Sequence, residues 1–176
     1  MIVKMRQETF EALADGAIEV ACVDPIIKAY KDILTRGGDF KSGLFKELSR
    51  GQQALFVFRA YYNHALKSVA DFYWWSAYFI AQPERWAGLK NGLHFFGDHA
   101  ALHVLESMEK ILHQRNHAMC LENFKVSFND LNNDPELMTS ITPLYDDLCQ
   151  TSLKTHQIIG SFIRNNPHDF VHIEMD

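Results

Sequence analysis

Hydrophobic and polar residues recur along this chain mainly with the period of an α-helix. From Arg50 to Lys67 the apolar residues are spaced three, four and seven apart, which places them on one helical face. The segment from Asp98 to Arg115 has the clearest apolar stripe, with polar residues opposite. The same pattern, together with Pro and Gly boundaries, predicts further helices over residues 3–22, 25–36, 41–48, 83–96 and 135–165, the last bent or interrupted at Pro143.

The segment from Ser68 to Ala81, SVADFYWWSAYFIA, is apolar on all sides. Its aromatic residues favour a strand, while its length and alanine content favour a buried helix. We predict a helix at the centre of the fold. The chain is then an all-α, single-domain bundle of about six or seven helices over residues 1–176, with a short C-terminal tail from about residue 166.

Composition excludes several classes of protein. With 17 Lys and Arg against 22 Asp and Glu, the formal net charge is −5, and no basic run offers a surface for phosphates. We therefore expect no nucleic-acid partner. No stretch approaches the roughly 20 uninterrupted apolar residues that span a bilayer, so we expect no membrane association.

The three cysteines, Cys22, Cys120 and Cys149, lie far apart and form no CxxC pair. This pattern is typical of reduced thiols in a reducing compartment. The N-terminus has no apolar core of signal-peptide length. We expect a cytoplasmic protein.

The stretch from about Leu48 to Leu112 resembles a family of largely uncharacterised bacterial helical proteins that includes a DNA-mimic protein. The resemblance rests on an aromatic-rich helix followed by WAGLKNGLHFFGDHAALHVLESMEKIL, whose Phe96-Gly97-Asp98 matches the family's helix–helix corner. The family's Asn-Gly-Gly motif is missing, and only the aromatic run from Phe72 to Trp75 occupies its place. The resemblance implies an all-helical fold and no enzyme activity. A net charge of −5 is too small to carry over the DNA-mimic role.

Three residues could bind a divalent metal. His99 and His103 are spaced i and i+4 on a predicted helix, and Glu106 follows one turn later. Side chains at this spacing share one helical face and can bind one ion. The commoner interpretation is a solvated face, because the three lie opposite the apolar stripe. No other cofactor is indicated.

The aromatic segment offers a second candidate site. Asp71 lies within it, and a carboxylate among rings could act as a general acid or base. The surrounding rings of Tyr62, Trp74, Trp75 and Tyr78 could bind a small apolar or flat ligand. The alternatives are structural: Asp71 caps the first turn of its helix, and the rings form a core or an oligomer interface.

Because no convergent polar cluster is evident, we favour a non-enzymatic helical protein that acts through protein–protein contacts, as a homodimer or with another protein partner. The alternatives are a metal-binding protein or enzyme that uses His99, His103 and Glu106, and a small-ligand binder with Asp71 in an aromatic pocket.

Overall fold

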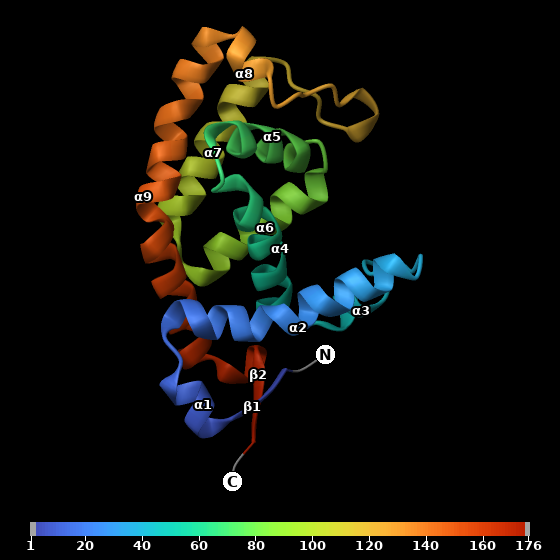
Figure 1. The fold of residues 1–176 in the computed structure, drawn as a ribbon, viewed down its shortest axis with the longest axis vertical. Coiled ribbons are helices and arrows are strands. Elements are labelled where there is room, and N and C mark those ends of the chain that lie inside the picture. Colours follow the sequence, from blue (N-terminus) through green and yellow to red (C-terminus); the bar gives the residue numbers. More distant parts are fainter. Residues whose placement is uncertain (1–2, 175–176) are drawn as a thin grey trace. The chain divides into compact units, whose positions relative to one another are not determined.

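The computed structural model describes residues 3–174, and this part of the chain is mostly helical (Figure 1). It contains nine α-helices: α1 Gln7–Ala12, α2 Asp15–Thr35, α3 Leu44–Glu47, α4 Arg50–Ala65, α5 Val69–Ile80, α6 Pro83–Phe96, α7 His99–Gln114, α8 Asp130–Asn133 and α9 Pro135–Asn165. Two 3-10 helices, η1 Leu121–Asn123 and η2 Pro167–Asp169, and two strands, β1 Val3–Arg6 and β2 Val171–Glu174, complete the described chain. The all-α prediction is confirmed. The helix number exceeds the expected six or seven because α1, α3 and α8 are only 6, 4 and 4 residues long.

The chain divides into two compact units. The central unit runs from Val57 to Leu153, and the terminal unit comprises the chain up to Phe56 and from Lys154 onward. Helices α4 and α9 contribute residues to both. The single domain expected over residues 1–176 stays a prediction.

In the central unit, α5 packs against α6 and α7, which confirms the aromatic segment as a central helix. Ser68 caps α5 by accepting a hydrogen bond from the Asp71 amide at 3.0 Å. The corner between α6 and α7 is also as predicted, because Gly97 ends α6 in the left-handed region and Asp98 caps α7. The apolar stripe of α7 is buried over residues Ala101, Val104, Leu105, Met108 and Leu112.

In the terminal unit, β1 and β2 pair in parallel, with Val3 opposite Val171 and Arg6 opposite Glu174. The continuous helix predicted over residues 3–22 is therefore wrong for residues 3–6, and it is also broken where α1 ends at Ala12 and α2 begins at Asp15. Residues 3–6 find hydrogen-bond partners in the C-terminal tail, which no local pattern reveals. The tail leaves α9 close to residue 166, as expected, and its Phe170 is fully buried.

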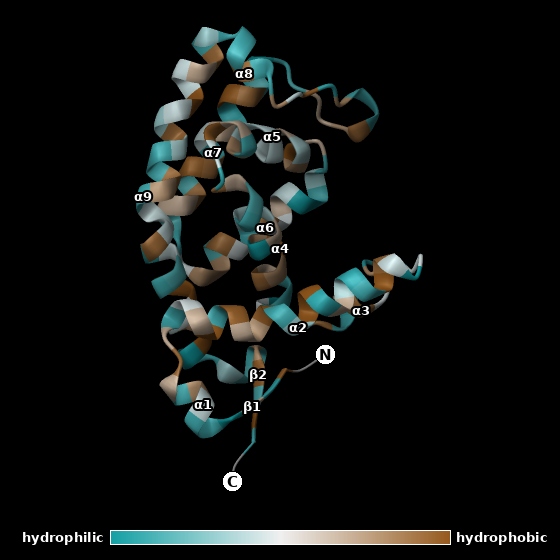
Figure 2. Ribbon diagram, in the orientation of Figure 1, coloured by the Kyte–Doolittle hydropathy of each residue, from teal (hydrophilic) through white to brown (hydrophobic). Residues whose placement is uncertain are grey.

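Two prolines do not interrupt their helices. The predicted helix start at Pro25 is wrong, since α2 continues through it. Ile18, Cys22 and Ile26 are fully buried at spacings of four, so packing on both sides of the proline offsets the missing hydrogen bond. Helix α9 likewise continues through Pro143. Figure 2 shows hydrophobic and hydrophilic residues alternating along α9, as expected for a helix with one buried face.

Candidate functional site

The chain between α7 and α8, residues 116–129, forms a long segment with little regular structure, which we call the arm. In Figure 1 it extends from the helices of the central unit as an open loop. It begins at Asn116, which adopts a left-handed conformation with φ 56°. The amide of His117 then donates to the Leu112 carbonyl at 3.0 Å, which closes the end of α7 and sets the direction in which the arm leaves it.

Tyr73 of α5 holds both ends of the arm. Its hydroxyl lies 2.8 Å from Nε2 of His117 at the start of the arm, and donates to a carboxylate oxygen of Asp130 at 3.1 Å just beyond its end. The same Asp130 oxygen accepts from the Ser127 amide at 2.9 Å. Surface loops whose two ends lie close together are frequently functional.

Burial is the main influence on the ionisation of this network. It raises the pKa of Tyr73, and the neighbouring Asp130 carboxylate raises it further. Burial also lowers the pKa of His117, while the Leu112 carbonyl and Asp130 partly oppose this. The phenol therefore stays protonated and acts as a hydrogen-bond donor. In this geometry its two contacts hold the arm.

An ion pair also joins the chain just before the arm to the chain beyond it. Arg115, the last residue before the arm, pairs with Asp134, which precedes α9. Asp134 also accepts from the Leu137 amide at 2.9 Å and so caps α9. The hydrogen bond from the Leu137 amide is the main reason that the pKa of Asp134 is lowered, and the positive charge of Arg115 lowers it further.

The middle of the arm packs on Trp74 of α5. The indole ring stacks on Tyr78 and on Phe128, each at 5.0 Å between centroids and within 15° of parallel. Phe124 and the indole meet edge to face at 5.7 Å between centroids, and the indole N–H donates to the Val126 carbonyl at 3.1 Å. The predicted ligand-binding rings of Trp74 and Tyr78 therefore contact each other and the arm.

The other predicted ligand-binding and catalytic residues also have partners within the central unit. Trp75 stacks on the imidazole of His64 at 4.1 Å, and the fully buried Tyr62 packs on Phe58 at 4.2 Å. Asp71 accepts a hydrogen bond from the Ser68 hydroxyl at 2.6 Å and belongs to the cap of α5. A ligand-binding or catalytic role for these residues stays a prediction.

The predicted metal ligands His99, His103 and Glu106 are all exposed on α7. Over residues 3–174, no group of three or more His, Cys, Asp or Glu side chains is placed to hold a metal ion. A metal-binding role for these three residues stays a prediction. The imidazole of His94 in α6 is the ring that approaches His99.

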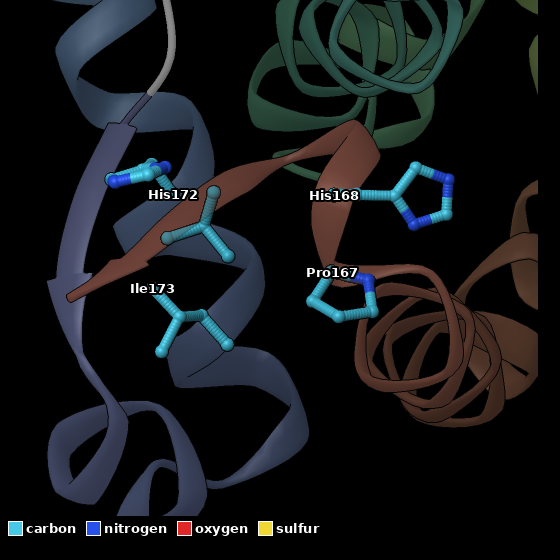
Figure 3. Close-up of a pocket in the computed structure, with 5 residues that line it drawn as sticks. Pro167, His168, His172 and Ile173 are labelled. Carbon is cyan, nitrogen blue, oxygen red and sulfur yellow. The ribbon is translucent and has the colours of Figure 1, made fainter. Parts of the chain in front are cut away.

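The terminal unit contains a shallow hollow of about 300 Å³ beside β2 and η2 (Figure 3). It is lined by Pro167, His168, Val171, His172 and Ile173. Figure 3 shows the imidazoles of His168 and His172 pointing away from each other. The hollow therefore lacks a convergent pair of polar groups.

The arm differs from the rest of the surface in its exposed apolar side chains. Met119, Leu121 and Phe128 are 45%, 47% and 43% exposed, and only two other large hydrophobic residues of the described chain are comparably exposed. Figure 2 shows hydrophobic colouring on the arm where it lies away from the helices. Three of the five most exposed large hydrophobic residues of the described chain therefore belong to one loop.

The sequence did not single out the arm or His117 as functional. Phe124, Val126 and Phe128 alternate with polar residues, a pattern typical of extended chain, but the structure has no strand at these residues. His117 follows His113 by four residues, as on one face of a helix end, yet it lies beyond α7 and bonds to Tyr73. The length of the segment without helical periodicity was the available signal, since long irregular loops in small domains are commonly functional.

Comparisons with models of known protein families, with curated proteins and with solved structures found no match to this chain. The resemblance to the bacterial helical family therefore stays a prediction. None of the helices in residues 3–174 is both long enough and apolar enough to cross a membrane.

Proposed function

We propose that this protein is a non-enzymatic interaction module that associates with a second copy of itself through the arm. The observation that carries the proposal is the exposure of Met119, Leu121 and Phe128 on one segment. Association would remove these side chains from water, which is the main favourable contribution in most protein interfaces.

The charge of the arm favours a second copy as its partner. Two copies of a chain with net charge −5 repel one another at most orientations. The arm, however, carries one acid, Glu122, and one base, Lys125, and is close to neutral. In a two-fold symmetric contact each copy presents the same surface, so Glu122 of one copy can face Lys125 of the other.

The attachment of the arm to α5 supports the same role. Tyr73 holds its ends, and Trp74 packs against its middle. A segment that is already ordered loses less conformational entropy on binding. The arm can therefore form a specific contact despite its irregular structure.

Sedimentation equilibrium over a concentration series tests the proposal. Burial of a whole leucine side chain contributes about 1.5–3 kcal/mol, so the exposed half of Leu121 is worth about 1 kcal/mol per copy. A symmetric dimer contains two copies, and Leu121→Ser is expected to weaken dimerisation by about 2 kcal/mol, or about 30-fold in Kd.

Leu153→Ser is the matched control, because Leu153 is 71% exposed and lies outside the arm. This variant is expected to dimerise like the wild type. At about 1 mM, sedimentation detects a dimer held by as little as about 4 kcal/mol of binding free energy. A wild-type chain that is still monomeric at this concentration would contradict the proposal. Equal effects of the two substitutions would show that the contact lies elsewhere.

A further inference from the structure

The corner between α6 and α7 is fixed by backbone hydrogen bonds. Gly97 has φ 80°, a left-handed conformation that closes the end of α6, and the amide of Asp98 donates to the Leu93 carbonyl at 2.9 Å. The carboxylate of the buried Asp98 then accepts from the Ala101 amide at 3.0 Å and starts α7. Farther from the corner, Lys90 and Glu109 join the two helices by an ion pair at 2.6 Å.

This corner brings two exposed imidazoles together. His94 lies in the last turn of α6 and His99 is the first residue of α7. Their ring centroids are 6.1 Å apart, with the planes inclined at 65°. The rings therefore meet edge to face, in an arrangement set by the ends of two helices.

We propose that His94 and His99 form a two-imidazole site for a divalent transition-metal ion of the kind that imidazole binds well, such as Zn²⁺, Ni²⁺ or Cu²⁺. Water would complete the coordination. Imidazole nitrogens bind such ions at about 2.0–2.1 Å, which puts the centroids of two tetrahedral ligands about 5 Å apart. The observed separation of the centroids is 6.1 Å, and both side chains are exposed. The proposed site needs the two rings to turn toward one shared ion.

The ends of the two helices act on the two ligands in opposite senses. The C-terminal end of α6 favours a positive charge at His94, and the N-terminal end of α7 disfavours one at His99. The site differs from the predicted set of His99, His103 and Glu106, because its two ligands come from different helices. It is independent of the arm and of self-association.

Isothermal titration of the full-length chain without a histidine tag, with Zn²⁺ and with Ni²⁺, tests this site. We expect one ion per chain in the wild type, and an affinity at least about tenfold lower in His94→Ala and in His99→Ala, since each removes one of two ligands. His103→Ala and His113→Ala, which replace exposed histidines of the same helix, are expected to bind like the wild type. Circular dichroism of each variant checks that the helices are intact.

The other outcomes overturn the proposal. No binding to the wild type excludes the site. Loss of binding in His103→Ala with retention in His94→Ala would assign the metal to the pair on α7. NMR of the wild-type chain gives a second measurement. A small amount of Ni²⁺ should broaden the ring signals of His94 and His99 before those of the other histidines. Equal broadening of all exposed histidines would indicate non-specific binding.

Discussion

Replacement of Tyr73 by Phe removes one oxygen atom from a side chain that is only 1% exposed. The ring keeps its packing, so the substitution tests the hydroxyl alone. The lost contacts are those to Nε2 of His117 at 2.8 Å and to the Asp130 carboxylate at 3.1 Å. We expect the arm to lose one contact at each end while α5 stays folded.

The two contacts set the size of the effect. A hydrogen bond contributes about 0.5–1.5 kcal/mol net, so two contribute about 1–3 kcal/mol. His117 and Asp130 are half-buried, and water can replace part of what they lose. The expected decrease in the free energy of unfolding is therefore about 1–2 kcal/mol. For a chain of this length, each kcal/mol lowers Tm by about 2–4 °C.

Hydrogen exchange followed by mass spectrometry distinguishes loss of the attachment from general destabilisation. In Tyr73→Phe, the amides of residues 116–129 should exchange faster relative to those of α5. Tyr61→Phe is the matched control, because its buried hydroxyl bonds to Ser76 at 2.7 Å and has no contact with the arm. If Tyr73→Phe leaves both Tm and arm exchange unchanged, or if Tyr61→Phe affects the arm equally, the assignment of Tyr73 as the residue that holds the arm is refuted.

Two further predictions concern stability. Gly160→Ala should destabilise the protein by about 1–3 kcal/mol, because a β-carbon there would lie 2.5 Å from Cα of Asp15. Gly88→Ala in α6 meets open space and should stabilise the protein by up to about 1 kcal/mol. Chemical denaturation of both variants measures the difference, and equal effects of the two substitutions would contradict the packing at Gly160. Burial lowers the pKa of His117 in the folded state below its ordinary value of 6.5, so the unfolded chain binds protons more readily and stability should decrease as the pH falls below about 6.5. His117→Gln should flatten this decrease without abolishing it, because burial lowers the pKa of His64 in the same direction; an unchanged pH profile of Tm would contradict the assignment.

Much of the helical fold follows from local sequence signals. Gly97 and Asp98 occupy the cap positions that the sequence predicts, because capping depends on a side chain and backbone groups within a few residues. The apolar stripe of α7 is buried for the same reason, since its period is read directly from neighbouring positions.

The features that sequence did not predict depend on residues far apart in the chain. β1 pairs with β2 across almost the whole length of the chain. Tyr73 meets His117 and Asp130 only after α5, α6 and α7 have packed. Pairs of this kind leave no periodic pattern, so neither the strand at the N-terminus nor the attachment of the arm could be predicted from local spacing.

Hydrogen exchange of the wild-type chain at two concentrations, one well below and one well above the dimer Kd, tests the central claim most directly. If the arm is the contact between two copies, slower exchange at the higher concentration will be concentrated in residues 116–129. Protection that develops on other segments, or no dependence of arm exchange on concentration, would contradict the account.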